Sequence, residues 1–229
     1  MAVGTSNNVE LHAMSMVAME GEVRDVNGGI DTGFNGTLWV RFYDQKSTIK
    51  VVFSDDSSRK VYYYKDVLYQ GQVSVTAGKF NISFQVPKDI KSGMGAPRFS
   101  LYAYDSLRVV EAMGKYDGLT LGGTDPAMVP DNEGPKITFY WNTPEFENGQ
   151  SVERQGTLYA DLYDAQGIYH YGYSLGRDIV MSSNLSECNH LVLNDNYEPA
   201  LNDFRRGRVA LPLSGLEPGT YEFTLKAWD

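Results

Sequence analysis

The chain has 229 residues, which is enough for one large domain or two small ones. It carries 20 Lys and Arg against 29 Asp and Glu, a formal net charge of −9 that repels phosphate backbones and argues against nucleic acid as a partner. A single Cys excludes an internal disulfide framework and any multi-cysteine metal site, and no apolar run approaches the roughly 20 residues of a transmembrane helix.

The N-terminal end of the sequence does not have the pattern of a signal peptide. Residues 1–8 are small and polar, as in an expression tag or a disordered lead-in. The apolar run from Val9 to Met19 contains Glu10 and His12 and has no basic region before it, which differs from the pattern of a signal peptide. The cellular compartment therefore does not follow from this segment.

Residues 9–121 have the pattern of a first β domain. Leu38, Val40 and Phe42 recur at every second residue, so their side chains share one face of a strand and point into a core. Two extended runs, 73–75 and 80–86, flank Thr76–Lys79, where Gly78 supplies a positive φ; this pattern predicts a hairpin. A helical period over about ten residues is absent throughout.

The pattern of this first domain occurs twice. Gly36–Asp44 matches Gly156–Asp164 at an offset of 120 residues, and Ser100–Asp105 matches Thr224–Asp229 at an offset of 124. Two matches in the same order and at nearly equal offsets predict two homologous domains.

A linker and a second domain complete the predicted architecture. Residues 122–135 hold three Pro and three Gly and have little apolar content, which predicts a linker, and residues 136–229 form the second domain. The first copy continues beyond Asp105 to Leu121, whereas the second stops at its counterpart, Asp229. We therefore expect an all-β fold of two tandem immunoglobulin-like antiparallel β-sandwich domains, the second of them truncated.

Several blocks of the sequence resemble one family. The linker 122–135, the block Leu193–Glu198 and the closing run Phe223–Asp229 are similar to the region behind the catalytic domain of the PorU family. The similarity also includes Phe34–Thr37 and Val86–Ile90, and it covers most of the chain from about Val23 onward. PorU proteins are sortase-like cysteine peptidases of the type IX secretion system in Bacteroidetes and are related to the gingipains.

This resemblance implies a parent protein at the exterior of the outer membrane of a Gram-negative bacterium. There the parent, a cysteine endopeptidase, would remove C-terminal signals from secreted cargo and attach the cargo to lipopolysaccharide. The family's catalytic Cys and His lie in a preceding caspase-like domain, so no catalytic residue is carried over to this chain. The segment is then a non-catalytic scaffold or docking region whose partners are its own upstream peptidase domain, outer-membrane proteins of the secretion system, and cargo.

Cys188 is a weak candidate nucleophile. His190 lies two residues away, on the same face if the segment is a strand, and His170 is a further candidate neighbour. A thiolate nucleophile needs a base beside it and an oxyanion hole, and neither is signalled around Cys188. We expect a packed Cys next to a solvent-facing His.

Acidic residues form a candidate metal site. Asp161 and Asp164, with Asp195 and Glu198 in a later block, offer hard oxygen ligands of the kind that Ca²⁺ binds six to eight at a time. Their spacing does not match an EF-hand loop, and acidic residues at strand ends often cap turns. The sequence therefore predicts no cofactor, with Ca²⁺ as the alternative.

A tyrosine-rich segment supports a second functional hypothesis. Tyr169, Tyr171 and Tyr173 alternate, so on an extended segment they would share one face and offer a platform for a sugar ring. Gly167, Gly172 and Gly176 instead favour a loop. If the platform forms, the protein is a cell-surface adhesin or a carbohydrate-binding module.

Overall fold

The computed structural model describes residues 2–3, 10–127, 132–171 and 176–229. Over these ranges the fold is all-β, with two three-residue 3-10 helices, η1 (Ser186–Cys188) and η2 (Asn194–Asn196), besides the strands. The same ranges contain no helix with the length and apolar character needed to cross a bilayer. The chain divides into two compact units, Met1–Val129 and Pro130–Asp229, and the division falls within residues 122–135.

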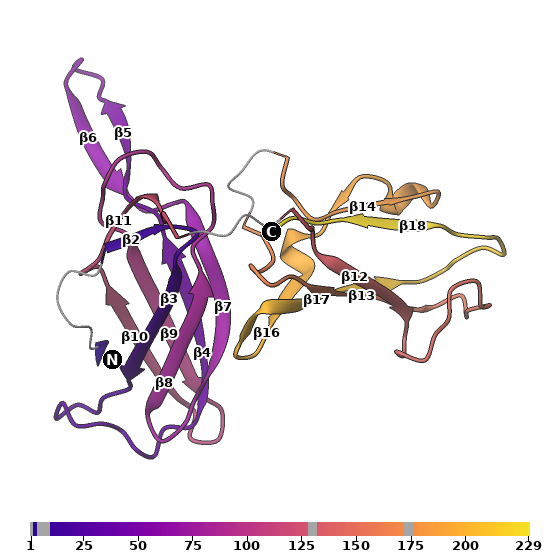
Figure 1. Ribbon diagram of the computed structural model, residues 1–229, viewed down its shortest axis with the longest axis horizontal. Helices are drawn as coiled ribbons and strands as arrows, with labels where there is room; N and C mark the ends of the chain where they lie inside the picture. The colour runs from indigo at the N-terminus through magenta and orange to yellow at the C-terminus, as the bar shows by residue number, and fades with distance from the viewer. Residues whose placement is uncertain (1, 4–9, 128–131, 172–175) are drawn as a thin grey trace. The chain divides into compact units, whose positions relative to one another are not determined.

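The first unit contains two main antiparallel sheets (Figure 1). The smaller sheet has the strand order β1 (Ala2–Val3), β3 (Met16–Glu22), β8 (Lys79–Gln85). The larger sheet has the order β10 (Val110–Tyr116), β9 (Arg98–Asp105), β4 (Gly36–Tyr43), β7 (Val67–Val75). A further pair, β2 (Glu10–Ala13) and β11 (Thr120–Thr124), is parallel, which departs from the purely antiparallel expectation.

Aromatic side chains from both sheets fill the core of the first unit. Phe84 of β8 stacks on Tyr69 of β7 with ring centroids 4.0 Å apart, and it contacts Phe42 of β4 at 5.4 Å and Phe99 of β9 at 6.0 Å. Since β8 belongs to the smaller sheet and the other three strands to the larger one, Phe84 packs the two sheets together as a sandwich.

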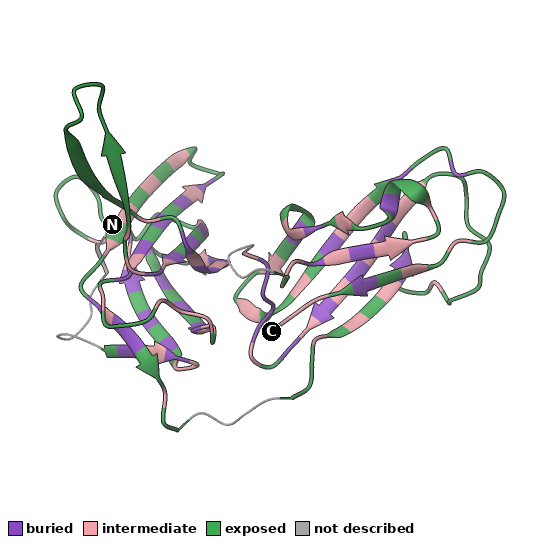
Figure 2. Cartoon of the chain, turned by 90° about the horizontal axis from the view of Figure 1, so that it is seen from above, coloured by how far each residue is buried: buried purple, intermediate pink, exposed green. Residues whose placement is uncertain are grey.

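Buried and exposed residues alternate along the central strands, as Figure 2 shows. Leu38, Val40 and Phe42 have no exposed surface, and Leu158, Ala160 and Leu162 of the second unit are 6% exposed or less. The predicted inward face of the strand around Leu38 is therefore confirmed, its counterpart around Leu158 has the same pattern, and the residues between them point to the outer face of the sheet.

The connection between β7 and β8 contains the predicted tight turn. Thr76 and Lys79 exchange two backbone hydrogen bonds of 2.9 and 3.0 Å, and Ala77 and Gly78 have φ values of 50° and 77°. A Cβ at position 78 would collide with the carbonyl oxygen of Asp31, so glycine is required there. Beyond the turn β7 pairs with β4 and β8 pairs with β3. The predicted two-stranded hairpin is therefore wrong, because each strand joins the sheet that buries its apolar face.

Both ends of the first unit differ in detail from the sequence expectations. Ala2 and Val3 pair with Glu22 and Gly21, so part of the expected lead-in is a strand, and residues 1 and 4–8 lie outside the described residues. Strand β11 continues to Thr124, so the first three residues of the predicted linker belong to a ladder.

A separate hairpin extends from the first unit (Figure 1). Strands β5 (Ser47–Val52) and β6 (Ser58–Tyr63) pair with each other, and every residue after Ser47 in the two strands is exposed. Lys50 and Lys60 stand directly opposite each other, an arrangement of like charges that weakens a ladder. This projecting hairpin was not predicted, because its sequence pattern does not distinguish it from the strands of the sandwich.

The second unit is also built from two antiparallel sheets. One has the order β12 (Lys136–Trp141), β13 (Gly156–Tyr163), β17 (Asp203–Leu213), β16 (Tyr197–Ala200). The other has the order β15 (Leu191–Val192), β14 (Val180–Ser183), β18 (Phe223–Lys226). Leu158 of β13 and Val209 of β17 belong to the same hydrophobic core as Met181 of β14 and Leu225 of β18, so the two sheets form a second sandwich.

The two sequence matches differ in their structural meaning. Strands β4 and β13 both lie inside four-stranded sheets, and the aspartates that follow them, Asp44 and Asp164, are both buried. The later match does not hold, because β9 pairs with β4 whereas β18 pairs with β14 in the other sheet. An alternating strand that ends in Asp fits any half-buried position, so its sequence does not determine which strand it pairs with.

Candidate functional site

The outer face of the larger sheet in the first unit carries an exposed aromatic pair. Trp39 on β4 and Tyr102 on β9 are cross-strand partners, with ring centroids 5.6 Å apart and ring planes inclined by 36°. Their side chains are 40% and 37% exposed. Both point outward because Leu38, Val40 and their neighbours take the inward positions of the pleat.

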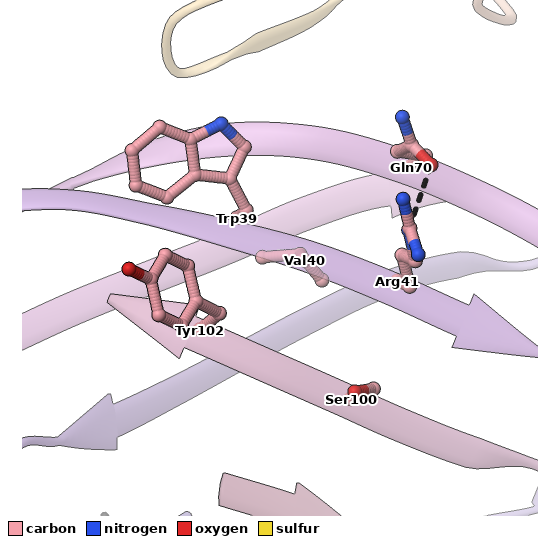
Figure 3. A pocket seen from close by; sticks show the side chains of 6 residues that line it. All are labelled: Trp39, Val40, Arg41, Gln70, Ser100 and Tyr102. Carbon is pink, nitrogen blue, oxygen red and sulfur yellow. Dashed lines mark hydrogen bonds between the residues drawn. The ribbon is translucent and has the colours of Figure 1, made fainter. Parts of the chain in front are cut away.

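Polar side chains lie beside this pair (Figure 3). Arg41 is opposite Ser100 on β9 and opposite Gln70 on β7, and its Nε donates a 2.9 Å hydrogen bond to Oε1 of Gln70. Within the described part of the chain Arg41 forms no ion pair. These side chains line a pocket of about 420 Å³; the complete lining is Trp39, Val40, Arg41, Gln70, Ser100 and Tyr102.

Strand β10 pairs with β9 and extends the same outer face beyond the pocket. Partial burial, followed by a hydrogen bond to the Glu111 carboxylate, raises the pKa of the Tyr102 phenol, which therefore stays protonated at neutral pH. Met113 stands opposite Tyr102 and is 72% exposed, and Lys115 stands opposite Ser100. The face thus combines aromatic surface with amide, hydroxyl and guanidinium groups.

The second unit holds a covered counterpart of this aromatic pair. Tyr140 on β12 and Tyr159 on β13 are cross-strand partners whose rings stack at 5.2 Å and 24°. The guanidinium of Arg208 lies over both rings, 5.6 and 5.4 Å from their centroids, and its Nε and terminal nitrogen donate to the carboxylate of Asp161 at 2.6 and 3.1 Å. An ion pair from the chain itself therefore covers this pair.

The structure does not bring the predicted metal ligands together. Asp161 is engaged by Arg208, Asp164 is buried and accepts the backbone N–H of Gln166 at 2.7 Å, and Asp195 is an exposed residue of η2. Among the described residues no three His, Cys, Asp or Glu side chains form a group that would hold a metal. Asp161 takes part in an ion pair and Asp164 in a turn instead.

Among the described residues, the predicted tyrosine platform does not form a solvent-exposed surface. Tyr169 is only 3% exposed, and its backbone N–H donates to the carbonyl oxygen of Trp228 at 2.7 Å. The ring of Tyr171 meets the Tyr169 ring edge-on at 5.4 Å, and Tyr173 lies outside the described residues. Tyr169 therefore belongs to the packed interior, so it cannot offer its ring face to a sugar.

Cys188 is a packed thiol at the end of η1. It is 2% exposed, and burial, followed by the charge of Glu187, raises the pKa of the thiol, which keeps it protonated. His190 is exposed, in a turn with a φ of 58°. In the described chain no hydrogen bond joins Cys188 to His190 or to His170. A protonated, buried sulfur lacks the character of an activated nucleophile.

His170 is buried and uncharged at neutral pH. Its ring packs on Tyr171 and Tyr197 at 4.1 and 4.5 Å, and its Nδ1 lies 3.2 Å from the carbonyl oxygen of Ile168. Among the described residues its Nε2 has no hydrogen-bond partner. Burial lowers the pKa of the imidazole to about 4.

A buried charge cluster that was not expected from the sequence lies at the base of the β5–β6 hairpin. Nζ of Lys91 lies 2.6 Å from Oδ2 of Asp66, whose side chain is 5% exposed, and 2.7 Å from Oγ of Ser47. Asp44 accepts the backbone N–H groups of Lys91 and Gln45 at 2.7 and 2.6 Å, and burial raises the pKa of its carboxyl. An aspartate directly after a strand is the only local signal for this cluster, which ties the hairpin to the loop around Lys91.

Replacing Lys91 by Met is expected to cost about 2 kcal/mol of unfolding free energy, because it removes the closer cation of the buried Asp66 carboxylate and leaves only the more exposed Lys65, 3.7 Å away. Equilibrium urea unfolding measures this loss. The double variant K91M/D66N should recover at least half of it, since the poorly compensated carboxylate is gone. The matched control is Lys60→Met on exposed β6, where a comparable loss would contradict the buried pair as the cause.

These features define an all-β protein of two β-sandwich units with an aromatic pocket on an outer sheet face of the first. No family model and no curated protein matches the sequence. Among solved structures, the chain is similar to dimeric latent PorU from Porphyromonas gingivalis, with 28% identity and a TM-score of 0.60 over 97% of this chain. The chain therefore has a PorU-related fold, as its sequence blocks predicted, and it spans 21% of that PorU chain.

Proposed function

We propose that the chain is the paired β-sandwich segment of a PorU-type cell-surface cysteine peptidase, where it acts as a non-catalytic scaffold or docking region. In this proposal the parent protein removes C-terminal signals from type IX secretion cargo and attaches the cargo to the cell surface. The segment positions the upstream peptidase domain and contacts cargo or outer-membrane proteins of the secretion system.

The observation that carries the proposal is the likeness to PorU over 97% of this chain, at a TM-score of 0.60. A match that runs through both units supports a shared arrangement of consecutive domains better than a match of one sandwich, because single sandwiches recur in proteins of unrelated function. The blocks at 122–135 and 193–198, which lie outside the alternating strand motifs, support the same family.

The state of the single thiol supports a non-catalytic role. A cysteine peptidase needs a thiolate and a neighbouring imidazole, whereas Cys188 is buried with a raised pKa and His190 is exposed to solvent. In the parent protein, Cys188→Ser is therefore expected to leave the peptidase rate unchanged. The corresponding substitution of the upstream catalytic Cys should abolish it.

Two measurements on the parent protein test this proposal: the rate of signal removal from a cargo protein, and the amount of cargo attached to cells. If C188S folds normally and still abolishes signal removal, the non-catalytic role is wrong. Deleting both sandwich units while keeping the peptidase domain should lower cargo processing or attachment at least about tenfold. Full processing and attachment without the two units would refute the scaffold role.

A further inference from the structure

The aromatic pair of the first unit is exposed to solvent, whereas its counterpart in the second unit is covered by another side chain. In the repeat that relates β4 to β13, Trp39 corresponds to Tyr159 and Arg41 corresponds to Asp161. Asp161 holds Arg208 over the rings of Tyr140 and Tyr159. The first unit has Arg41 at that position, so the arrangement that covers the aromatic surface is missing there.

The open face is larger than one aromatic contact. Trp39 and Tyr102 are both more than a third exposed, and the pocket that they line measures about 420 Å³, within the range of small-molecule sites. The outward residues of the smaller sheet contain no aromatic side chain; they are Met16, Ala18, Glu20 and Glu22 on β3 and Lys79, Asn81, Ser83 and Gln85 on β8. The exposed rings of the sandwich are thus concentrated on one of its two outer faces.

Charge and hydrogen-bonding groups narrow the class of ligand. Arg41 uses its Nε for Gln70, which leaves its two terminal NH₂ groups available, and it has no ion-pair partner within the described residues. Lys115 adds a second positive charge opposite Ser100, against the single carboxylate of Glu111, which is bound to Tyr102. On a chain of net charge −9 this face is locally positive, which suits a carboxylate.

We propose that Trp39, Tyr102 and Arg41 form a binding site for an acidic oligosaccharide built from uronic acid units. The apolar face of one pyranose ring stacks on the two aromatic rings. The sugar carboxylate accepts hydrogen bonds from the terminal nitrogens of Arg41, and the amide of Gln70 and the hydroxyl of Ser100 bind ring hydroxyls. This activity is separate from the scaffold role and does not depend on it.

Calorimetric titration of the whole 229-residue chain with three probes tests the proposal. Hexagalacturonate should bind saturably, and its fully methyl-esterified form should bind at least about fivefold more weakly, because the ester cannot pair with Arg41. A hexamer of glutamate carries carboxylates without sugar rings and should not bind. The absence of saturable hexagalacturonate binding would overturn the proposal, and equal binding of the glutamate hexamer would overturn it in favour of a general carboxylate site.

Variants connect the binding to this face. Trp39→Ala is expected to weaken hexagalacturonate binding about tenfold, because it removes the stacking surface. Arg41→Gln should weaken binding of the acid but leave binding of the methyl ester unchanged. The matched control is Tyr159→Ala in the covered pair, which should bind like the original chain. Unchanged binding by W39A, or an equal loss in Y159A, would contradict this location. Thermal unfolding of each variant separates loss of binding from loss of fold.

Discussion

Replacing Phe84 by Ala is expected to lower the unfolding free energy of the first unit by about 3–5 kcal/mol. Phe84 has no exposed surface, and its ring contacts Phe42, Phe99 and Tyr69 across the sandwich. The truncation leaves a cavity between two sheets, whose strands cannot close it without breaking their registers.

Urea unfolding of the full chain measures this loss, and hydrogen exchange of amides in β4 and β9 assigns it to the first unit. The matched control is Phe53→Ala near the tip of the β5–β6 hairpin, where the ring is 45% exposed and the cost should stay below about 0.5 kcal/mol. A loss under about 1 kcal/mol for F84A would contradict its place as the contact between the sheets.

Lowering the pH from 7 to 4.5 is expected to cost the second unit about 2.5 kcal/mol of unfolding free energy through His170 alone. Burial lowers the pKa of this imidazole from 6.5 to about 4. Above pH 6.5 the imidazole of His170 is neutral in both the folded and the unfolded chain, so no stability is lost. Between pH 6.5 and 4 the unfolded chain binds a proton that the folded chain does not, so stability falls as the pH falls. Below pH 4 the imidazole is protonated in both the folded and the unfolded chain, so the loss of unfolding free energy stops increasing.

At least one ion-paired carboxyl group of this unit titrates below that window. The hydrogen bonds from Arg205 hold the pKa of Asp203 below 3.8, so the stability that Asp203 contributes is retained through pH 4.5. The measurement is urea unfolding at several pH values, followed by the fluorescence of Trp141 and Trp228 in a Trp39→Phe background. His170→Phe should remove the dependence between pH 6.5 and 4, whereas His190→Phe at an exposed position should retain it. The same slope in H170F would show that another group causes it.

Local sequence pattern predicts which face of a strand is buried, because the pleat has a period of two residues and needs no knowledge of the partner strand. Leu38, Val40 and Phe42 illustrate this. The local pattern does not predict which strands pair with each other, as β7 and β8 demonstrate. They are joined by the expected tight turn, yet they separate into opposite sheets because that places both apolar faces in one core.

The candidate site was harder to predict for the same reason. Tyr169 and Tyr171 suggested a platform because they alternate in sequence, but burial of Tyr169 depends on its bridge to Trp228, far along the chain. Trp39 and Tyr102 lie on separate strands, far apart in the sequence, so no local pattern relates one to the other. Only the pairing of β4 with β9 makes them a pair.

By itself, the sequence determined that the chain is all-β, which residues of its central strands face the core, and that it resembles the PorU family. These properties follow from local periodicity and from contiguous blocks of residues. The tertiary structure decided which aromatic pair is covered, since Arg208 and Asp161 reach the rings of Tyr140 and Tyr159 only through the register of β17 on β13. It also decided that Trp39 and Tyr102 remain open, because strand register sets which distant side chains meet on a sheet face.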